Sequence, residues 1–109
     1  MAKAEIKLGE MSYGSLDATS QSYSSGSKIT LEVSGKEVVC AVVTENGNSN
    51  TFVAEMYGNK VTRSSNGGAP STYDLPYTVG SFTYEKTAHG YAFTETASGR
   101  TIYATMLYN

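Results

Sequence analysis

Few residues of this sequence could carry acid–base or nucleophilic chemistry. His89 is the only histidine and Cys40 the only cysteine. A Ser-His-Asp or Cys-His arrangement would have to use His89, which is followed by Gly90 in a segment typical of a turn. Cys40 lies inside the apolar run 38–43, where a thiol is usually an inert small apolar side chain. We therefore expect no catalytic residue, and we interpret His89 as a turn residue.

Metal, cofactor and phosphate sites are not predicted either. A zinc site would need several Cys or His residues. Calcium prefers carboxylates, but the two aspartates, Asp17 and Asp74, are far apart in the sequence. Gly67-Gly68 has neither the Lys-Ser/Thr nor the helix of a phosphate-binding loop. Five glutamates fit the solvent-facing positions of strands, and no motif pairs them as a glycosidase would: Glu32, Glu37, Glu55, Glu85 and Glu95.

Composition and charge favour an all-β domain that does not bind nucleic acid. The chain has 109 residues, enough for one domain, with 39% hydrophobic and 17% charged residues and nine Tyr but no Trp. The net charge is −2 and the basic residues are scattered, whereas nucleic-acid binders cluster Lys and Arg. No apolar run is long enough for a transmembrane helix. The first ten residues, MAKAEIKLGE, lack the apolar core of a signal peptide.

The chain is organised around a predicted β-meander over residues 28–64. Residues 28–33 alternate between apolar and polar, and Ser34-Gly35 supplies a tight turn. The continuous apolar run 38–43 predicts a central strand that is buried on both faces. A third strand over 51–57 and a fourth over 60–64 follow, separated by Gly58-Asn59.

A second meander is predicted over residues 76–108. Its strands cover 77–86, 90–96 and 101–108, and Gly80 inside the first of them suggests a bulge or a close approach of backbones. With a strand at 2–8, the fold class is all-β: an antiparallel β-sandwich or small β-barrel of about six to eight strands in one domain, 1–109. Within residues 1–27, the weakly patterned segment 9–27 is either a long surface loop, with a short polar strand at 16–22, or an arm that orders against a neighbouring subunit.

Tyrosine is the strongest compositional signal, and it is concentrated in the last third of the chain. Tyr is a good strand residue, but it is also enriched at protein interfaces. The strand 101–108 carries large apolar groups on both faces, so that one face needs either covering loops or another chain. We therefore predict an interface formed by Tyr103 first, with Leu107, Tyr91, Tyr84 and Tyr108.

In general character the chain resembles small all-β virion proteins of bacteriophages, of the capsid decoration or tail-associated type. The features that carry this resemblance are short Gly/Asn turns, strands rich in Ser, Thr and Tyr, the absence of a secretion signal and the lone Cys40. It implies a non-enzymatic structural protein located in the virion, with copies of itself or other virion structural proteins as partners and no cofactor. The alternatives are a glycan- or cell-surface-binding β-domain that uses a Tyr-rich face, and a cytoplasmic location.

Overall fold

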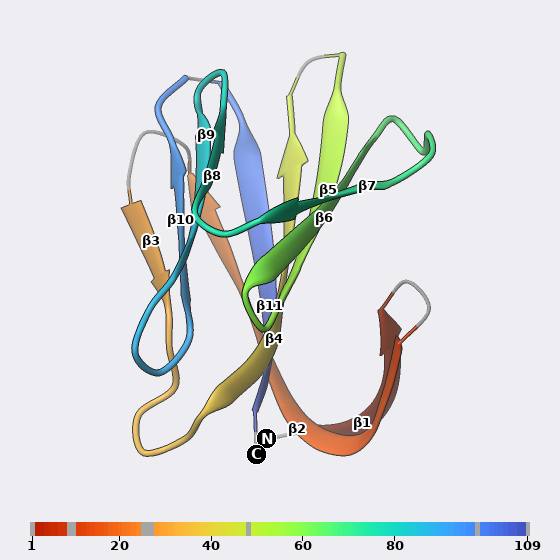
Figure 1. Cartoon of the computed structure of the whole chain (residues 1–109), viewed down its shortest axis with the longest axis vertical. Coiled ribbons are helices and arrows are strands. Elements are labelled where there is room, and N and C mark those ends of the chain that lie inside the picture. Colours follow the sequence, from red (N-terminus) through yellow and green to blue (C-terminus); the bar gives the residue numbers. More distant parts are fainter. Residues whose placement is uncertain (1, 9–10, 25–27, 48, 98, 109) are drawn as a thin grey trace.

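The computed structural model describes the backbone of residues 2–8, 11–24, 28–47, 49–97 and 99–108, and these residues form an all-β fold without a helix (Figure 1). The strands of this part of the chain are β1 (Ala2–Leu8), β2 (Met11–Ser24), β3 (Lys28–Leu31), β4 (Val38–Asn46), β5 (Thr51–Tyr57), β6 (Lys60–Ser65), β7 (Ser71–Asp74), β8 (Tyr77–Val79), β9 (Phe82–Lys86), β10 (Tyr91–Glu95) and β11 (Thr101–Tyr108).

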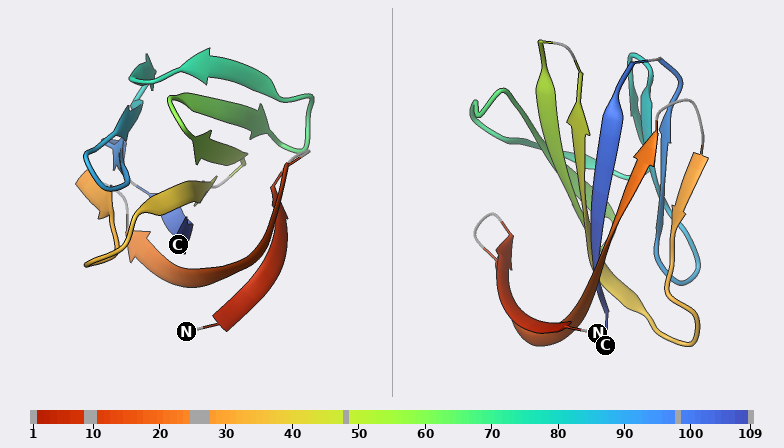
Figure 2. Two further views of the ribbon diagram at one scale, coloured as in Figure 1. Left: turned by 60° about the horizontal axis from the view of Figure 1, so that its bottom comes forward. Right: turned by 180° about the vertical axis from the view of Figure 1, so that it is seen from behind.

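The strands form two antiparallel sheets that pack together as a β-sandwich and do not close into a barrel. The larger sheet has the strand order β1-β2-β11-β4-β5-β6-β7, and the smaller one β3-β10-β9-β8. Figure 2 shows the smaller sheet lying along one side of the larger one. The predicted fold class is thus confirmed, in its sandwich form.

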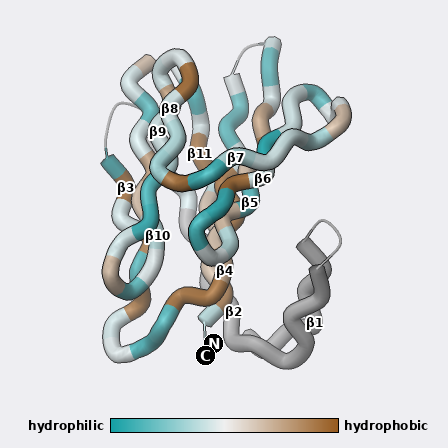
Figure 3. The backbone as a smooth tube through the Cα atoms, in the orientation of Figure 1, coloured by the Kyte–Doolittle hydropathy of each residue, from teal (hydrophilic) through white to brown (hydrophobic). Residues whose placement is uncertain are grey.

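The apolar run predicted as a central strand occupies the middle of the larger sheet, as the first part of β4. Val38, Cys40, Ala41 and Val43 are buried there, and Val39 and Val42 are partly buried. Figure 3 shows this run as a hydrophobic stretch next to more hydrophilic turns. β4 pairs with β11 on one side and β5 on the other, which explains why both of its faces are largely covered.

The predicted pairing of strands within the two meanders is partly wrong. The strand at residues 28–31 does not pair with β4; it joins the smaller sheet beside β10. Likewise β11 leaves β10 and crosses to the larger sheet, between β2 and β4. The physical reason is that the alternation of apolar residues marks a strand and its buried face, but it does not say which neighbour supplies the hydrogen bonds.

Two short strands were missed. The predicted strand 77–86 is a hairpin of β8 and β9, because Gly80 adopts a positive φ of 57° and turns the chain. β7 follows the loop at residues 66–70 and forms the edge of the larger sheet beside β6. An edge strand needs only one partner, so a weak local pattern is sufficient there.

The segment predicted as a loop or an arm contains β2, a strand of 14 residues. β2 pairs with β1 along its first part and with β11 along its second, so tertiary pairing outweighs the weak local pattern. The β1–β2 hairpin curves to the side of the larger sheet that faces away from the smaller one (Figures 1 and 2). Residues 9, 10 and 25–27 of the predicted loop lie outside the described residues.

One glycine is required by a close approach between strands of the smaller sheet. A Cβ atom on Gly90 would lie 2.1 Å from the carbonyl oxygen of Leu31. Gly90 immediately precedes β10, whose first residue, Tyr91, pairs with Leu31. The absence of a side chain at residue 90 therefore allows β3 to join this sheet.

Candidate functional site

The structure separates the five predicted interface residues into one exposed and four buried side chains. Tyr103 is 49% exposed, whereas Tyr84, Tyr91, Leu107 and Tyr108 are almost completely buried. The four buried residues therefore cannot offer side-chain surface to a partner, and this part of the prediction is wrong. Tyr103 alone fits the predicted role.

The three buried tyrosines are covered because they lie on strand faces turned into the protein. Tyr84, Tyr91 and Tyr108 all belong to the main hydrophobic core. The Tyr91 hydroxyl donates a hydrogen bond to the carbonyl oxygen of Val39 at 3.3 Å, and burial raises the pKa of Tyr91 to about 12. These tyrosines thus supply core volume with a satisfied polar tip, which is the ordinary structural use of the residue.

Leu107 is buried on the other face of the larger sheet, the one turned away from the smaller sheet. It lies beside Cys40 in the register, and both side chains are fully buried although neither belongs to the main core. Because Leu107 is completely buried within its own chain, its place on the strand 101–108 needs no second chain to cover it.

Tyr103 shares this outer face with a second exposed tyrosine that the sequence analysis did not select. Tyr103 pairs with Thr44 on β4, and Cys40, four residues earlier on the same face, pairs with Tyr57 on β5. Tyr57 is 42% exposed, and these two are the exposed large hydrophobic side chains of the residues whose burial is known. Tyr57 ends β5 and points to the opposite face from the buried residues Ala54 and Met56. This alternation in the sequence could have predicted its exposure.

The outer face between the two tyrosines mixes hydroxyl and aliphatic groups. Val42, Thr44, Val53, Glu55 and Thr105 are half-buried there. A mixed, partly apolar surface with tyrosine is typical of protein–protein interfaces. Glu55, which pairs with Val42, is the one charged residue between the two tyrosines on these strands. We call this surface, defined by Tyr57, Tyr103 and the residues between them on β4, β5 and β11, the outer tyrosine face.

A second aromatic feature runs from the surface into the core. The rings of Tyr73 and Tyr77 are stacked with their centroids 4.0 Å apart and their planes 7° apart. Tyr77 stacks in turn on Tyr84, at 6.4 Å, and Tyr84 contacts Phe93. Tyr73 and Tyr77 are half-buried, so this stack presents its outer end at the surface, where β7 leaves the larger sheet for β8.

A polar cluster lies between the two sheets at the end where β4 finishes and β11 begins. Glu45 on β4 and Glu95 on β10 are both completely buried. The Tyr84 hydroxyl donates a hydrogen bond to Glu45 Oε1 at 3.3 Å and accepts one from Arg63 Nε at 2.7 Å. Glu95 accepts a hydrogen bond from the amide of Ala97, and its Oε2 is 3.6 Å from Arg100 Nε.

Both arginines of this polar cluster contact the same two phenylalanine rings. The rings of Phe52 and Phe82 contact each other at 5.1 Å. The guanidinium carbon of Arg63 lies 4.9 Å and 5.1 Å from their centroids, and that of Arg100 lies 5.2 Å from each. Guanidinium groups stack favourably on aromatic rings, and this stacking accounts for two arginines so close to a hydrophobic core.

Burial dominates the electrostatics of Glu45. It raises the pKa of the Glu45 carboxyl to about 8, against the opposing effects of Arg63, the Tyr84 hydrogen bond and Arg100, while Glu95 adds to the increase. Burial also raises the pKa of Tyr84, so that its hydroxyl stays protonated. At neutral pH Glu45 is therefore mainly a neutral carboxylic acid inside the protein.

The expectation that Glu95 faces solvent was wrong, and Glu45 was overlooked. Ala41, Val43 and Glu45 are alternate residues of β4 and point to the same, inner face. The alternation along that strand therefore already implied that Glu45 is buried. Glu95 occupies the inward position after Phe93 on β10 in the same way. Of the other predicted solvent-facing glutamates, Glu32 and Glu37 are exposed, and Glu55 and Glu85 are half-buried.

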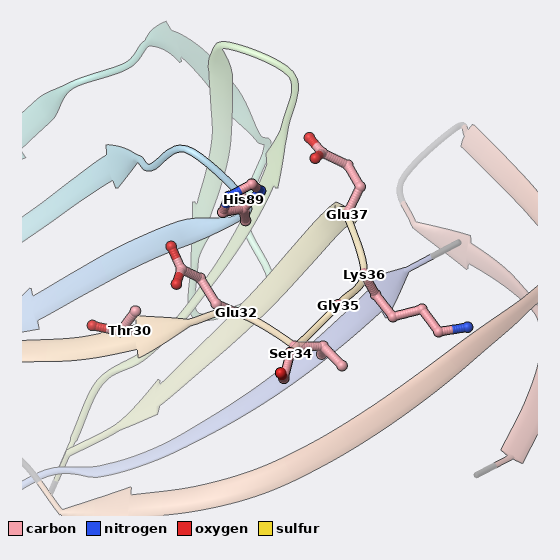
Figure 4. Close-up of a pocket in the computed structure, with 8 residues that line it drawn as sticks. Thr30, Glu32, Ser34, Gly35, Lys36, Glu37 and His89 are labelled. Carbon is pink, nitrogen blue, oxygen red and sulfur yellow. The ribbon is translucent and has the colours of Figure 1, made fainter.

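The single histidine lies beside a hollow at the opposite end of the sandwich. The hollow has a volume of about 800 Å³, and Figure 4 shows the residues that line it, among them Glu32, Glu37 and His89. The Glu32 carboxylate accepts a hydrogen bond from the Thr87 hydroxyl at 2.7 Å, and the His89 carbonyl oxygen accepts one from the amide of Val38. These contacts fix the turn at residues 87–90, as expected of a structural role.

Comparison with protein-family models, curated proteins and solved structures finds no significant match. Among the residues whose positions are described, no group of three or more His, Cys, Asp or Glu side chains is arranged to hold a metal ion. The same part of the chain contains no helix long and apolar enough to cross a membrane. Functional inference therefore depends on the surfaces and clusters of this chain alone.

Proposed function

We propose that this is a non-enzymatic structural protein that assembles through its outer tyrosine face. The observation that carries the proposal is the exposure of Tyr57 and Tyr103 on one face of the larger sheet, on either side of the central strand β4. Tyrosine contributes a large contact area at a low cost in conformational entropy, and it is enriched at interfaces. The partner proposed first is a second copy of the chain, and other structural proteins of the same particle come next.

The dimensions of this face support an interface of ordinary size. The three strands of this face, β11, β4 and β5, together with the adjoining strand β6 span about 19 Å across the sheet, and seven residues along them span about 23 Å. A standard interface buries about 800 Å² on each partner, which corresponds to a patch about 30 Å across. The outer face of these four strands thus covers about half of the area of such a patch.

Assembly of copies through this face suits a symmetric contact between two sheets. In an isologous contact the same patch serves both subunits, so a mixed surface without a strong charge of one sign is self-complementary. Sheets packed face to face cross at about 30° and interdigitate their side chains. The setting proposed for this contact is a virion, which follows from the resemblance to small all-β phage proteins described for the sequence.

The test replaces both exposed tyrosines with serine and measures the mass of the particle in solution. We expect wild-type protein to show a mass above the 11.6 kDa of one chain that increases with concentration, and Tyr57→Ser/Tyr103→Ser to remain a monomer with little change in melting temperature. Thr94→Ala, on the outer side of the smaller sheet, is the matched control and should assemble like the wild type. Normal assembly of the double variant would refute the proposal.

A second candidate function is glycan binding through the stacked pair Tyr73 and Tyr77. The observation in its favour is the nearly parallel ring stack at 4.0 Å, which ends at the surface beside β7. Such a ring is a platform for the apolar face of a sugar. Titration with oligosaccharides would support this function if Tyr73→Ala abolished the binding, and binding that was unaffected by Tyr73→Ala would exclude this platform.

A further inference from the structure

Arg63 is held in a fixed orientation with part of its hydrogen-bonding capacity unused. Its Nε donates to the Tyr84 hydroxyl at 2.7 Å, and its guanidinium group stacks on the rings of Phe52, Phe82 and Tyr84. Within the described part of the chain, its terminal nitrogens Nη1 and Nη2 have no hydrogen-bond partner. Arg63 is therefore a preorganised cation that still has donors to offer.

Arg63 lines a small pocket. It has a volume of about 150 Å³, and its other lining residues are Phe52, Tyr73, three serines and an alanine. Two of the serines are placed by strand pairing: Ser71 lies opposite Arg63, and Ser65 lies opposite Phe52. Because paired residues share a sheet face, both serines belong to the same face as the arginine.

The surrounding charges leave Arg63 without a full ionic partner. Glu95 is engaged by Arg100, at 3.6 Å, and by the amide of Ala97. Glu45 makes no hydrogen bond to Arg63 and is bridged to it by the Tyr84 hydroxyl; burial raises the pKa of its carboxyl to about 8, although Arg63 acts to lower it. Among the described residues Arg63 therefore has no carboxylate within ion-pair distance, and it lines the pocket.

We propose that this pocket binds one carboxylate or phosphate group of a ligand, with the terminal nitrogens of Arg63 and the hydroxyls of Ser65 and Ser71 as donors. The planar fork of arginine matches the two oxygens of either group. Pockets for whole small molecules have volumes of about 300–1,000 Å³, so this one holds a single charged group while the rest of the ligand lies outside, next to Tyr73. The site is independent of the outer tyrosine face, because Arg63 and Ser71 lie on the inner side of the larger sheet.

The experiment titrates the full chain separately with sodium phosphate, sodium acetate and sodium chloride and follows the backbone amide signals by NMR. We expect saturable shifts at residues 63, 65 and 71 with phosphate, acetate or both, at a dissociation constant on the order of 1–10 mM, and none with chloride. Saturation by one salt alone identifies which of the two anionic groups the pocket accepts. Absence of saturable shifts with both salts would overturn the proposal.

Variants distinguish anion binding in the pocket from a general effect of the positive charge on the protein surface. Arg63→Gln should weaken binding at least about tenfold, as expected for the loss of a charged hydrogen-bonding partner. Lys60→Gln removes an exposed cation from the same strand and should leave binding unchanged. If Arg63→Gln does not fold, Ser71→Ala keeps the arginine and should still weaken binding several-fold. Equal binding by wild type and Ser71→Ala, or by wild type and a folded Arg63→Gln, would refute the site.

Discussion

Replacement of Glu45 with glutamine should remove a pH dependence from the stability of the protein. Burial raises the pKa of the Glu45 carboxyl from 4.5 to about 8 in the folded state. A raised pKa means that the folded state binds the proton more tightly than the unfolded state. The stabilisation is therefore complete below pH 4.5 and is lost as the pH rises through about 8.

The size of the effect follows from these two pKa values. Each pH unit between them is worth about 1.4 kcal/mol, so the free energy of unfolding should fall by about 2–3 kcal/mol between pH 6 and pH 9. For a domain of this length that loss corresponds to a decrease in melting temperature of about 8–12 °C. Glutamine has nearly the same shape and cannot ionise, so Glu45→Gln should lack this component.

Urea unfolding of the wild type and Glu45→Gln, followed by circular dichroism at several pH values, measures the effect. Taking the difference between the two proteins removes the contributions of all groups that titrate in the same way in both. Parallel stability curves from pH 6 to pH 9 would refute the reasoning. They would show that Arg63 and Arg100 compensate for burial and keep Glu45 ionised throughout the range.

The other predictions concern the packing of the two sheets. Gly90→Ala should reduce the free energy of unfolding by more than about 2 kcal/mol in thermal or urea unfolding, because its Cβ would lie 2.1 Å from the Leu31 carbonyl oxygen. Phe82→Ala should cost about 3–5 kcal/mol in the same assay, since this ring packs against two other rings and two guanidinium groups. Cys40, which is completely buried, should react with a thiol reagent only as fast as the protein unfolds, and rapid labelling of the native protein would contradict this placement.

The sequence allowed the strands to be located better than their partners. The run at 38–43 is central because its apolar residues are continuous, and a local pattern is sufficient to show that. Leu31 and Met106 also alternate as a strand residue should, yet one lies in the smaller sheet and the other in the larger. The choice between sheets depends on contacts between distant segments, such as the close approach of Gly90 to Leu31. Such contacts produce no periodic pattern of residues in the sequence.

For the candidate surfaces, too, the sequence pattern located residues but not the segments that pack against them. Tyr103 was found because its strand carries large groups on both faces, but the pattern could not show that Leu107 is covered by the chain itself. Glu45 could have been found from its inward parity after Val43. Its partners could not, because Arg63, Tyr84 and Arg100 come from three different strands or turns, and only the fold brings them together.

The proposed assembly face is tested most directly by the solvent accessibility of its two tyrosines at increasing protein concentration. Hydroxyl-radical footprinting with mass spectrometry measures the modification rate of each side chain in one sample, and sedimentation velocity gives the mass of the particle in parallel. We predict that the rates at Tyr57 and Tyr103 fall together as the mass increases above that of the monomer, while the rate at Tyr77 stays constant. Unchanged rates at Tyr57 and Tyr103 in an assembled particle, or a monomer at every concentration, would contradict assembly of copies through this face.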